Sequence, residues 1–280
     1  MRAIQTMSLL LAWAALSAAI LPGADETLQD HGRELSNKYK ETVISVKLVI
    51  TTCYVYGGRE TNKRESKNEI SGTVIDASGL TVLSLFALDP SAARSDWSFD
   101  TGGENMKVKT ESNVTDVKLI LSDGTEIPAQ VVLKDKDLDL AFVKPKEKLE
   151  KPCQFVNFAK PRTAPEILDD ILVIGRLGRE VNRVTSIALG QVEAIVKKPR
   201  TFYVCGARGG HAALGCPVFN AQGETLGLTI MRMNPVKESG FFGGGGRPVV
   251  LPSEDLLEVA KQALAAKPED PAKEKPEEKK

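Results

Sequence analysis

Residues 121–144, LSDGTEIPAQVVLKDKDLDLAFVK, are the stretch of sequence that says most about the fold. Together with the apolar residues just before it, the stretch predicts two strands, 117–121 and 127–133, in which apolar and β-branched residues recur. The segment between them, 122–124, reads Ser-Asp-Gly and is typical of a turn, so we expect a hairpin. A further strand is predicted over 138–144. The stretch therefore indicates β-structure built from hairpins.

Runs of the same kind recur along the rest of the chain and predict further strands. They lie at 43–56, 70–75, 80–88, 171–174, 183–192, 201–205, 216–219 and 225–231. The polar segments 57–69 and 89–115 predict an exposed loop and a surface insertion. Helices are predicted at 25–40 and at 254–265, the second with Ser253 as its N-cap and Leu264 among its inward-facing residues. Short strands separated by turns favour an all-β barrel or sandwich.

Composition narrows the classes of partner. The 280 residues are 42% apolar, which is enough for a large core, and the 37 Lys and Arg residues balance the 37 Asp and Glu residues. A chain without net charge gives no reason to expect nucleic acid as a partner.

The N-terminus predicts export. Residues 1–24 have the features of a signal peptide: Arg2 precedes the apolar run 7–20, and Ser17-Ala18-Ala19 is a small-residue cleavage site. We expect a secreted or periplasmic protein with no stable membrane insertion after cleavage. An uncleaved anchor is the alternative, although the apolar run is short for one.

Export places the four cysteines, Cys53, Cys153, Cys205 and Cys216, where disulfides persist. The pairing is left open. Cys153 lies in a proline-containing connection, 147–161, and is expected to be a bridge partner. The spacing of Cys205, His211 and Cys216 fits no common zinc pattern, so a disulfide or buried thiols are expected there rather than a metal.

A glycine-rich loop lies within TFYVCGARGGHAALGCPVFN, residues 201–220. Apolar runs on both sides predict a strand, a tight loop and a second strand. Glycines let backbone N–H groups turn inward, as a loop that stabilises an oxyanion requires. A second glycine-rich loop, 240–247, lacks the Lys and Ser or Thr of a phosphate-binding loop, so no cofactor is expected.

These motifs resemble trypsin-like serine peptidases of the HtrA/Deg type. The family pattern L-S-D-G followed by D-L-A-L-L-K matches 121–144, and S-G-V-I-I-D-x-x-G matches 71–79. The resemblance runs from about residue 41 to residue 265 and implies two six-stranded antiparallel β-barrels with short terminal helices. The implied segments are an N-terminal helical segment at 25–42, barrels at 43–148 and 149–252, a C-terminal helix at 253–266 and a disordered charged tail at 267–280.

The resemblance also assigns site residues. It implies that Asp139 is the triad aspartate, with Asp137 the candidate if the register slips by two; on its own, an aspartate at a strand start is more typical of a solvated turn. It puts Phe86 where the general-base histidine should stand. Aligned on Pro217 and Asn220, it puts Leu214 at the nucleophile, in an oxyanion loop of Ala212, Ala213 and Leu214.

Neither a phenyl ring nor an isobutyl group can accept a proton or attack a carbonyl carbon. The sequence therefore predicts an exported pseudo-peptidase that binds a peptide or protein, with Arg208 and His211 in the pocket. The alternative is an active serine- or cysteine-type endopeptidase with a displaced nucleophile, such as Cys216 or Ser84 served by His211. The ligand and the oligomeric state are not predicted.

Overall fold

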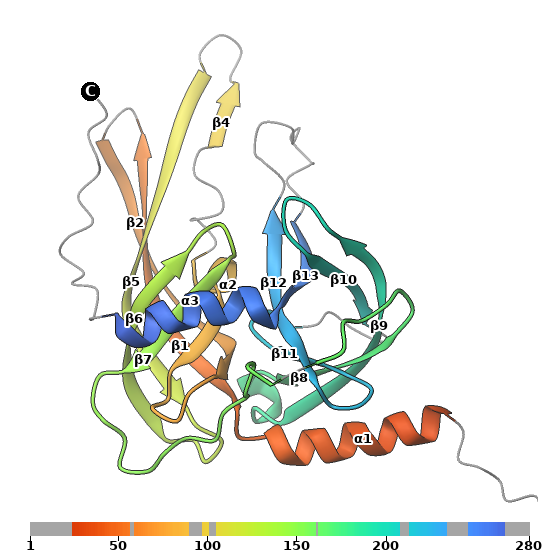
Figure 1. The fold of residues 1–280 in the computed structure, drawn as a ribbon. Helices are drawn as coiled ribbons and strands as arrows, with labels where there is room; N and C mark the ends of the chain where they lie inside the picture. The colour runs from red at the N-terminus through yellow and green to blue at the C-terminus, as the bar shows by residue number, and fades with distance from the viewer. Residues whose placement is uncertain are drawn as a thin grey trace, which may run out of the picture.

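The structure is a computed structural model that describes residues 24–56, 59–89, 97–100, 105–160, 162–207, 213–233 and 246–266. In this part of the chain, two closed antiparallel β-barrels lie side by side, with one helix before the first barrel and one after the second (Figure 1). The two-barrel fold expected from the sequence is confirmed. None of the described helices is both long enough and apolar enough to cross a membrane.

The first barrel is closed by hydrogen bonds between its first and last strands. Its order is β1 (Val43–Tyr56), β2 (Arg59–Val74), β3 (Thr81–Ser84), β7 (Leu140–Pro145), β6 (Glu126–Asp135) and β5 (Asn105–Ile120), and β5 returns to β1. A short strand, β4 (Trp97–Asp100), pairs with the outer part of β5.

The second barrel uses six strands from the rest of the chain. Its order is β10 (Phe202–Ala207), β13 (Gly246–Pro252), β12 (Thr225–Met233), β11 (Pro217–Asn220), β8 (Asp170–Arg176) and β9 (Thr185–Val196), which returns to β10. A 3-10 turn, η1 (Arg179–Val181), precedes β9.

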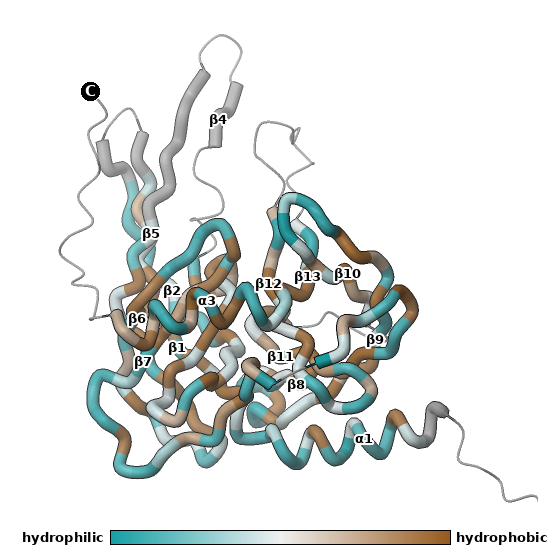
Figure 2. The backbone as a smooth tube through the Cα atoms, in the orientation of Figure 1, coloured by the Kyte–Doolittle hydropathy of each residue, from teal (hydrophilic) through white to brown (hydrophobic). Residues whose placement is uncertain are grey.

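Apolar side chains fill both barrels. In Figure 2, hydrophobic positions, coloured brown, recur along the strands of both barrels. In the first barrel Val46 and Leu48 are completely buried, and in the second Leu172, Ile174 and Leu228 are. Burial of such side chains is the main force that holds a barrel of this kind together.

The terminal helices pack on the barrels by one face each. Helix α1 (Ala24–Tyr39) buries Leu28, Leu35 and Tyr39, and the ring of Tyr39 stacks on Phe219 with centroids 4.9 Å apart. Helix α3 (Ser253–Ala265) buries Leu256, Val259, Ala260 and Ala263.

Two details of the C-terminal helix were wrong in the sequence analysis. Ser253 does not cap α3, because Pro252 holds the cap position and the Ser253 hydroxyl donates to the carbonyl of Thr225. Leu264, expected to face inward, is 43% exposed, and Ala263 is buried in its place.

The predicted loops at 57–69 and 89–115 were also largely wrong. Most of the first segment belongs to β2, and the second contains β4 and much of β5. These strands run past the end of the first barrel (Figure 1). The described side chains at 62–65 are exposed, so water reaches both faces of β2 there. No apolar alternation is needed where both faces are wet, and without alternation the sequence did not indicate a strand.

The predicted strand at 80–88 divides into two elements. Strand β3 ends at Ser84 and a single helical turn, α2 (Leu85–Leu88), follows. The Ser84 hydroxyl caps this turn by accepting a hydrogen bond from the N–H of Ala87 at 3.3 Å. A serine cap inside an apolar run is easily taken for part of a strand.

The structure can be compared with the expected segments at only some of their boundaries. The last strand of the first barrel ends with Pro145, and the first strand of the second begins with Asp170. Residues 146–169 connect them, a longer segment than the predicted connection 147–161. The expected signal peptide, apart from Ala24, and the charged tail lie outside the described residues.

Candidate functional site

The site expected from the sequence lies where the two barrels meet. Asp139 immediately precedes β7 in the first barrel, in the left-handed backbone region with φ +55°. It is 9% exposed. Strand β12 of the second barrel contacts both β3 and α2 here, so groups from both barrels reach the carboxylate.

Within the described part of the chain, three donors hold the Asp139 carboxylate. Its Oδ2 accepts from the Ser84 hydroxyl at 2.6 Å and from the Met231 N–H at 2.7 Å, and its Oδ1 accepts from the Phe86 N–H at 2.7 Å. These distances are those of strong, charge-assisted hydrogen bonds.

Burial raises the pKa of the Asp139 carboxyl above its ordinary value of 3.8. The three hydrogen bonds and the charge of Arg232 act in the opposite direction but do not cancel this effect. Burial at this site therefore destabilises the ionised form of the carboxyl group relative to its protonated form.

Phe86 and Asp139 are brought together, but through the backbone of Phe86. Its ring is half-buried on α2, and it offers no group that could exchange a proton with the carboxylate. Asp137 does not compete for the position. It is exposed, and its backbone carbonyl accepts from the Arg232 guanidinium at 2.9 Å.

The end of the glycine-rich loop packs against the first barrel beside Ser84. Gly215 has φ +76°, and a Cβ placed on it would lie 2.8 Å from the carbonyl oxygen of Ser71 and 3.4 Å from the N of Ser84. Its own carbonyl accepts from the Thr73 hydroxyl at 2.7 Å. Only glycine fits this approach without displacing the backbone.

Thr229 fixes the same loop from β12. Its hydroxyl donates to the carbonyl of Ala213 at 2.6 Å, and its carbonyl accepts from the N–H of Gly215 at 2.8 Å. Leu214, between these anchors, is half-buried. Ala212, Arg208 and His211, which the sequence analysis also assigned to this loop, lie outside the described residues.

The bridge expected at Cys153 is not borne out, whereas free thiols at Cys205 and Cys216 were one of the two outcomes expected there. All four cysteines are free thiols, including Cys153, which was expected to be a bridge partner. Burial raises the pKa of Cys216 and of Cys205 to about 12 each, and it also raises the pKa of Cys153. Buried thiols with such pKa values are poor nucleophiles near neutral pH.

Sequence reasoning missed two contributors to the site, Met231 and Thr229, and it named Ser84 only as an alternative nucleophile, not as a partner of Asp139. Met231 acts through its backbone N–H, so its residue type carries no signal. Ser84 and Thr229 are isolated hydroxyls inside apolar strands, where hydrogen bonding to a buried partner is the usual reason for a polar side chain. That pattern could have indicated them.

In the described ranges, His31 is the only histidine, and it lies on α1 with Nδ1 2.8 Å from the carbonyl oxygen of Ala221. No cluster of three or more metal-ligating side chains occurs among these residues.

Comparison with known proteins agrees with this architecture. The profile of a family described as a trypsin-like peptidase domain matches residues 42–228. The chain belongs to this family. No curated protein sequence matches it.

Among solved structures, the chain is similar to the MamO protease domain from Magnetospirillum magneticum in its apo form. The two are 16% identical with a TM-score of 0.50, and the match covers 79% of this chain and 97% of that one. At this identity the likeness concerns the fold alone.

Proposed function

We propose that this member of the trypsin-like peptidase family is catalytically silent and binds a peptide or protein ligand between its two barrels. The observation that carries the proposal is the environment of Asp139. In a working triad, the buried aspartate accepts a hydrogen bond from an imidazole N–H. Among the described residues, its donors here are the Ser84 hydroxyl and the backbone N–H groups of Phe86 and Met231.

The resemblance in sequence supports the same conclusion. It puts Phe86 at the base and Leu214 at the nucleophile. Phe86 is half-buried on α2, and Leu214 is half-buried beside Gly215. Both side chains supply apolar surface where a peptidase would supply a proton acceptor and an oxygen.

The described residues give little support to the alternative in which Ser84 or Cys216 acts as a displaced nucleophile. The Ser84 hydroxyl is 0% exposed and already donates to Asp139. Cys216 is completely buried, and its thiol has a pKa of about 12. A substrate carbonyl cannot approach either group without rearrangement of the loop.

The surface left at this junction suits an apolar ligand side chain. Phe86, Leu214, Met231 and Met233 are each partly exposed, and Ala213 is exposed. Methionine and aromatic side chains are common on surfaces that bind peptides of varied sequence. We place the ligand along these residues.

Two labelling reactions test whether the chain is silent. The purified protein is treated with a fluorophosphonate probe and separately with a thiol alkylator, and the modified residue is identified by mass spectrometry. We expect no serine to be labelled by the fluorophosphonate. Stoichiometric labelling of any serine, or rapid alkylation of Cys216 that also abolishes peptide hydrolysis, would show an active enzyme.

Peptide selection tests the binding role. Peptides selected from a random display library on the wild-type protein are measured by fluorescence anisotropy against wild type and against Leu214→Arg, which puts a charge into the apolar surface. We expect the variant to lose most of the affinity. Equal binding to both proteins would place the ligand elsewhere.

Membership of the HtrA/Deg branch and export are part of the same proposal. The motif at 121–144 supports the first, and the apolar N-terminal run supports the second. Expression in a secreting host followed by N-terminal sequencing tests export: a mature chain starting between residues 20 and 25 is expected. An intact Met1 would contradict it.

A further inference from the structure

The connection between the barrels begins at one end of the first barrel with residues 147–152, which we call the arch. The N–H of Lys146 donates to Pro128 at 3.0 Å, and beyond the arch the N–H of Cys153 donates to Ala77 at 3.0 Å. Between these anchors, residues 147–152 make no backbone hydrogen bond to the rest of the described chain. Backbone hydrogen bonds therefore hold the segment at its two ends only.

A cavity of about 740 Å³ lies beneath this arch. That volume is within the range of about 300–1,000 Å³ typical of small-molecule sites. None of the described residues assigned to the inter-barrel site lines it. The cavity is therefore separate from that site.

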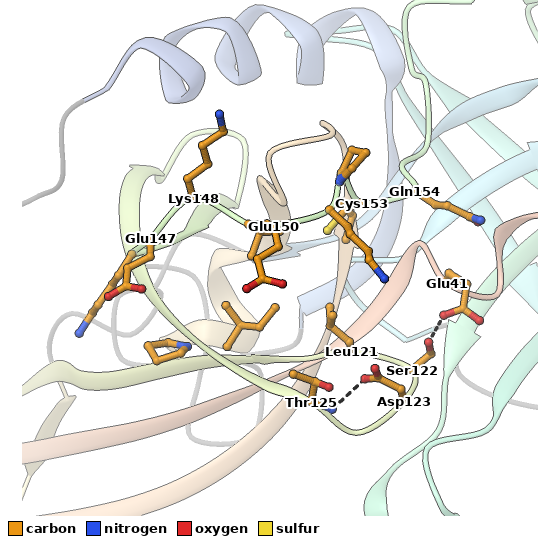
Figure 3. A pocket seen from close by; sticks show the side chains of 17 residues that line it. Glu41, Leu121, Ser122, Asp123, Thr125, Glu147, Lys148, Glu150, Cys153 and Gln154 are labelled. Atoms are coloured by element: carbon orange, nitrogen blue, oxygen red, sulfur yellow. Dashed lines mark hydrogen bonds between the residues drawn. The ribbon is translucent and has the colours of Figure 1, made fainter.

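The inner wall of the cavity is apolar. Leu121, Ile127, Leu149 and Cys153 line it from two directions, the β5–β6 hairpin and the arch (Figure 3). Leu121, Ile127 and Cys153 pack against the core of the first barrel, yet each is only half-buried. An apolar ligand body lying on them would complete the burial of surface that the chain leaves accessible.

Charged groups surround this wall. Lys146, Lys148 and Lys151 and four carboxylates line the cavity. Glu41 is engaged by the Ser122 hydroxyl, and Asp123 accepts from the N–H of Thr125 at 2.9 Å (Figure 3).

Glu150 differs from Glu41 and Asp123, the two carboxylates of the cavity that have a hydrogen-bond partner. Figure 3 shows its carboxylate directed into the cavity, whereas Lys148, two residues earlier on the same arch, points away. No hydrogen bond or ion pair engages Glu150 within the described part of the chain. An unpaired carboxylate above an apolar wall favours a ligand with one cationic group.

We propose that this cavity binds a small amphipathic cation, in which an ammonium or guanidinium group is joined to an aliphatic chain of several carbons. The cationic group lies against Glu150, and the chain covers Leu121, Ile127 and Leu149. Because the arch joins the two barrels, a bound ligand also stabilises the connection between them. This site is independent of the proposed peptide site, so either proposal can fail alone.

Cys153 makes the proposal measurable in the wild-type protein. Its sulfur lies in the wall of the cavity, so a ligand there shields it from iodoacetamide (Figure 3). Burial raises the pKa of the thiol, so the reaction is followed at alkaline pH. Cys53, a half-buried thiol on β1 that does not line the cavity, is the internal control.

Alkylation of both cysteines is quantified by peptide mass spectrometry with n-hexylammonium, hexanoate or hexanol present. With n-hexylammonium at ten times its dissociation constant, we expect the rate at Cys153 to fall about tenfold and the rate at Cys53 to stay unchanged. Hexanoate is expected to give no protection, and hexanol at most a little.

A pair of arch variants separates charge from shape. In Glu150→Gln, the affinity for n-hexylammonium should fall about two- to fivefold, as for the loss of one exposed ion pair. Lys148→Gln, on the same arch, should leave the affinity unchanged. Ligand-detected saturation-transfer NMR with the same proteins gives the affinity without relying on thiol chemistry.

Three results would overturn the proposal. The first is no binding of n-hexylammonium by either measurement. The second is equal or tighter binding of hexanoate, which would show that the lysines dominate. The third is binding of n-hexylammonium that Glu150→Gln and Lys148→Gln change equally.

Discussion

The backbone N–H of Phe86 donates to the Asp139 carboxylate at 2.7 Å, so the two residues that sequence alignment places side by side in a catalytic triad do meet in the fold. The contact is structural. It ties α2 to the start of β7, while the half-buried ring of Phe86 offers the carboxylate nothing to orient.

Replacement of Asp139 by asparagine is expected to destabilise the protein. Asn keeps one acceptor oxygen, but its amide N–H groups face a backbone N–H, leaving at least one buried donor unsatisfied. We expect the free energy of unfolding to fall by about 2–4 kcal/mol, since each buried unsatisfied group costs about 1–3 kcal/mol. Urea denaturation measures it. Asp137→Asn, on an exposed neighbour, is the control and should change little; equal stability of both variants would contradict the account.

The carboxyl group of Asp139 also contributes to the pH dependence of the free energy of unfolding. Its folded-state pKa is raised above 3.8, so the folded protein binds this proton more tightly than the unfolded chain does. The contribution to stability is complete below pH 3.8 and is lost as the pH rises through the folded-state pKa. The free-energy difference between wild type and Asp139→Asn should therefore grow as the solution is acidified through that pKa, and a difference that shrinks there would show that the pKa is lowered instead.

Alanine substitutions at Gly215 and Gly124 compare a glycine packed closely against the first barrel with a glycine in open space. Both have positive φ, +76° and +86°, but a Cβ on Gly215 would lie 2.8 Å from the Ser71 carbonyl oxygen, whereas one on Gly124 would meet nothing within 4 Å. Gly124→Ala should cost about 1 kcal/mol from backbone strain alone. Gly215→Ala should cost about 2–4 kcal/mol, because strain and steric overlap add. Similar costs in thermal or urea unfolding would show that the loop moves freely away from the first barrel.

Sequence reasoning predicted the barrels well because their strands have a buried face. The runs that became β1, β7, β8 and β12 are apolar for that reason. It failed on the outer parts of β2 and β5, whose mostly polar residues pair with the outer part of β1. At the site, a sequence motif indicated Asp139. Met231 contributes only its backbone N–H, which any residue except proline could supply, so its side chain gave no signal in the sequence.

An ion pair joins the two barrels and should stabilise them together. The Arg183 guanidinium donates to both carboxylate oxygens of Glu69 on β2, from Nε to Oε1 at 2.5 Å and from Nη2 to Oε2 at 2.8 Å. These bonds lower the pKa of Glu69. Lysine cannot reproduce this two-point contact. We expect Arg183→Lys to cost about 0.5–1.5 kcal/mol and to add no further loss in a Glu69→Gln background. Full additivity in that double-mutant cycle would show that the pair contributes nothing.

Restoring the missing groups tests whether the framework has kept the geometry of its family. Phe86→His puts an imidazole two residues after the Ser84 cap, on the turn whose backbone binds Asp139, and Leu214→Ser puts a hydroxyl beside the loop fixed by Gly215 and Thr229. A positioned general base contributes about 10²–10⁴ to the rate. We therefore expect the double variant to react with a fluorophosphonate at least about a hundredfold faster than either single variant, with labelling confined to Ser at position 214.

The control for this experiment is the double variant carrying Asp139→Asn, which should lose most of the gain because the imidazole is no longer held in the required tautomer. If the double variant remains unreactive, adding Ala212→Gly tests whether the loop backbone is the obstacle, since glycine can turn an N–H inward where alanine resists. Failure of the triple variant, with its fold intact by circular dichroism, would mean that Phe86 and Leu214 do not lie where a base and a nucleophile can meet. The junction between the barrels would then have diverged in shape as well as in chemistry.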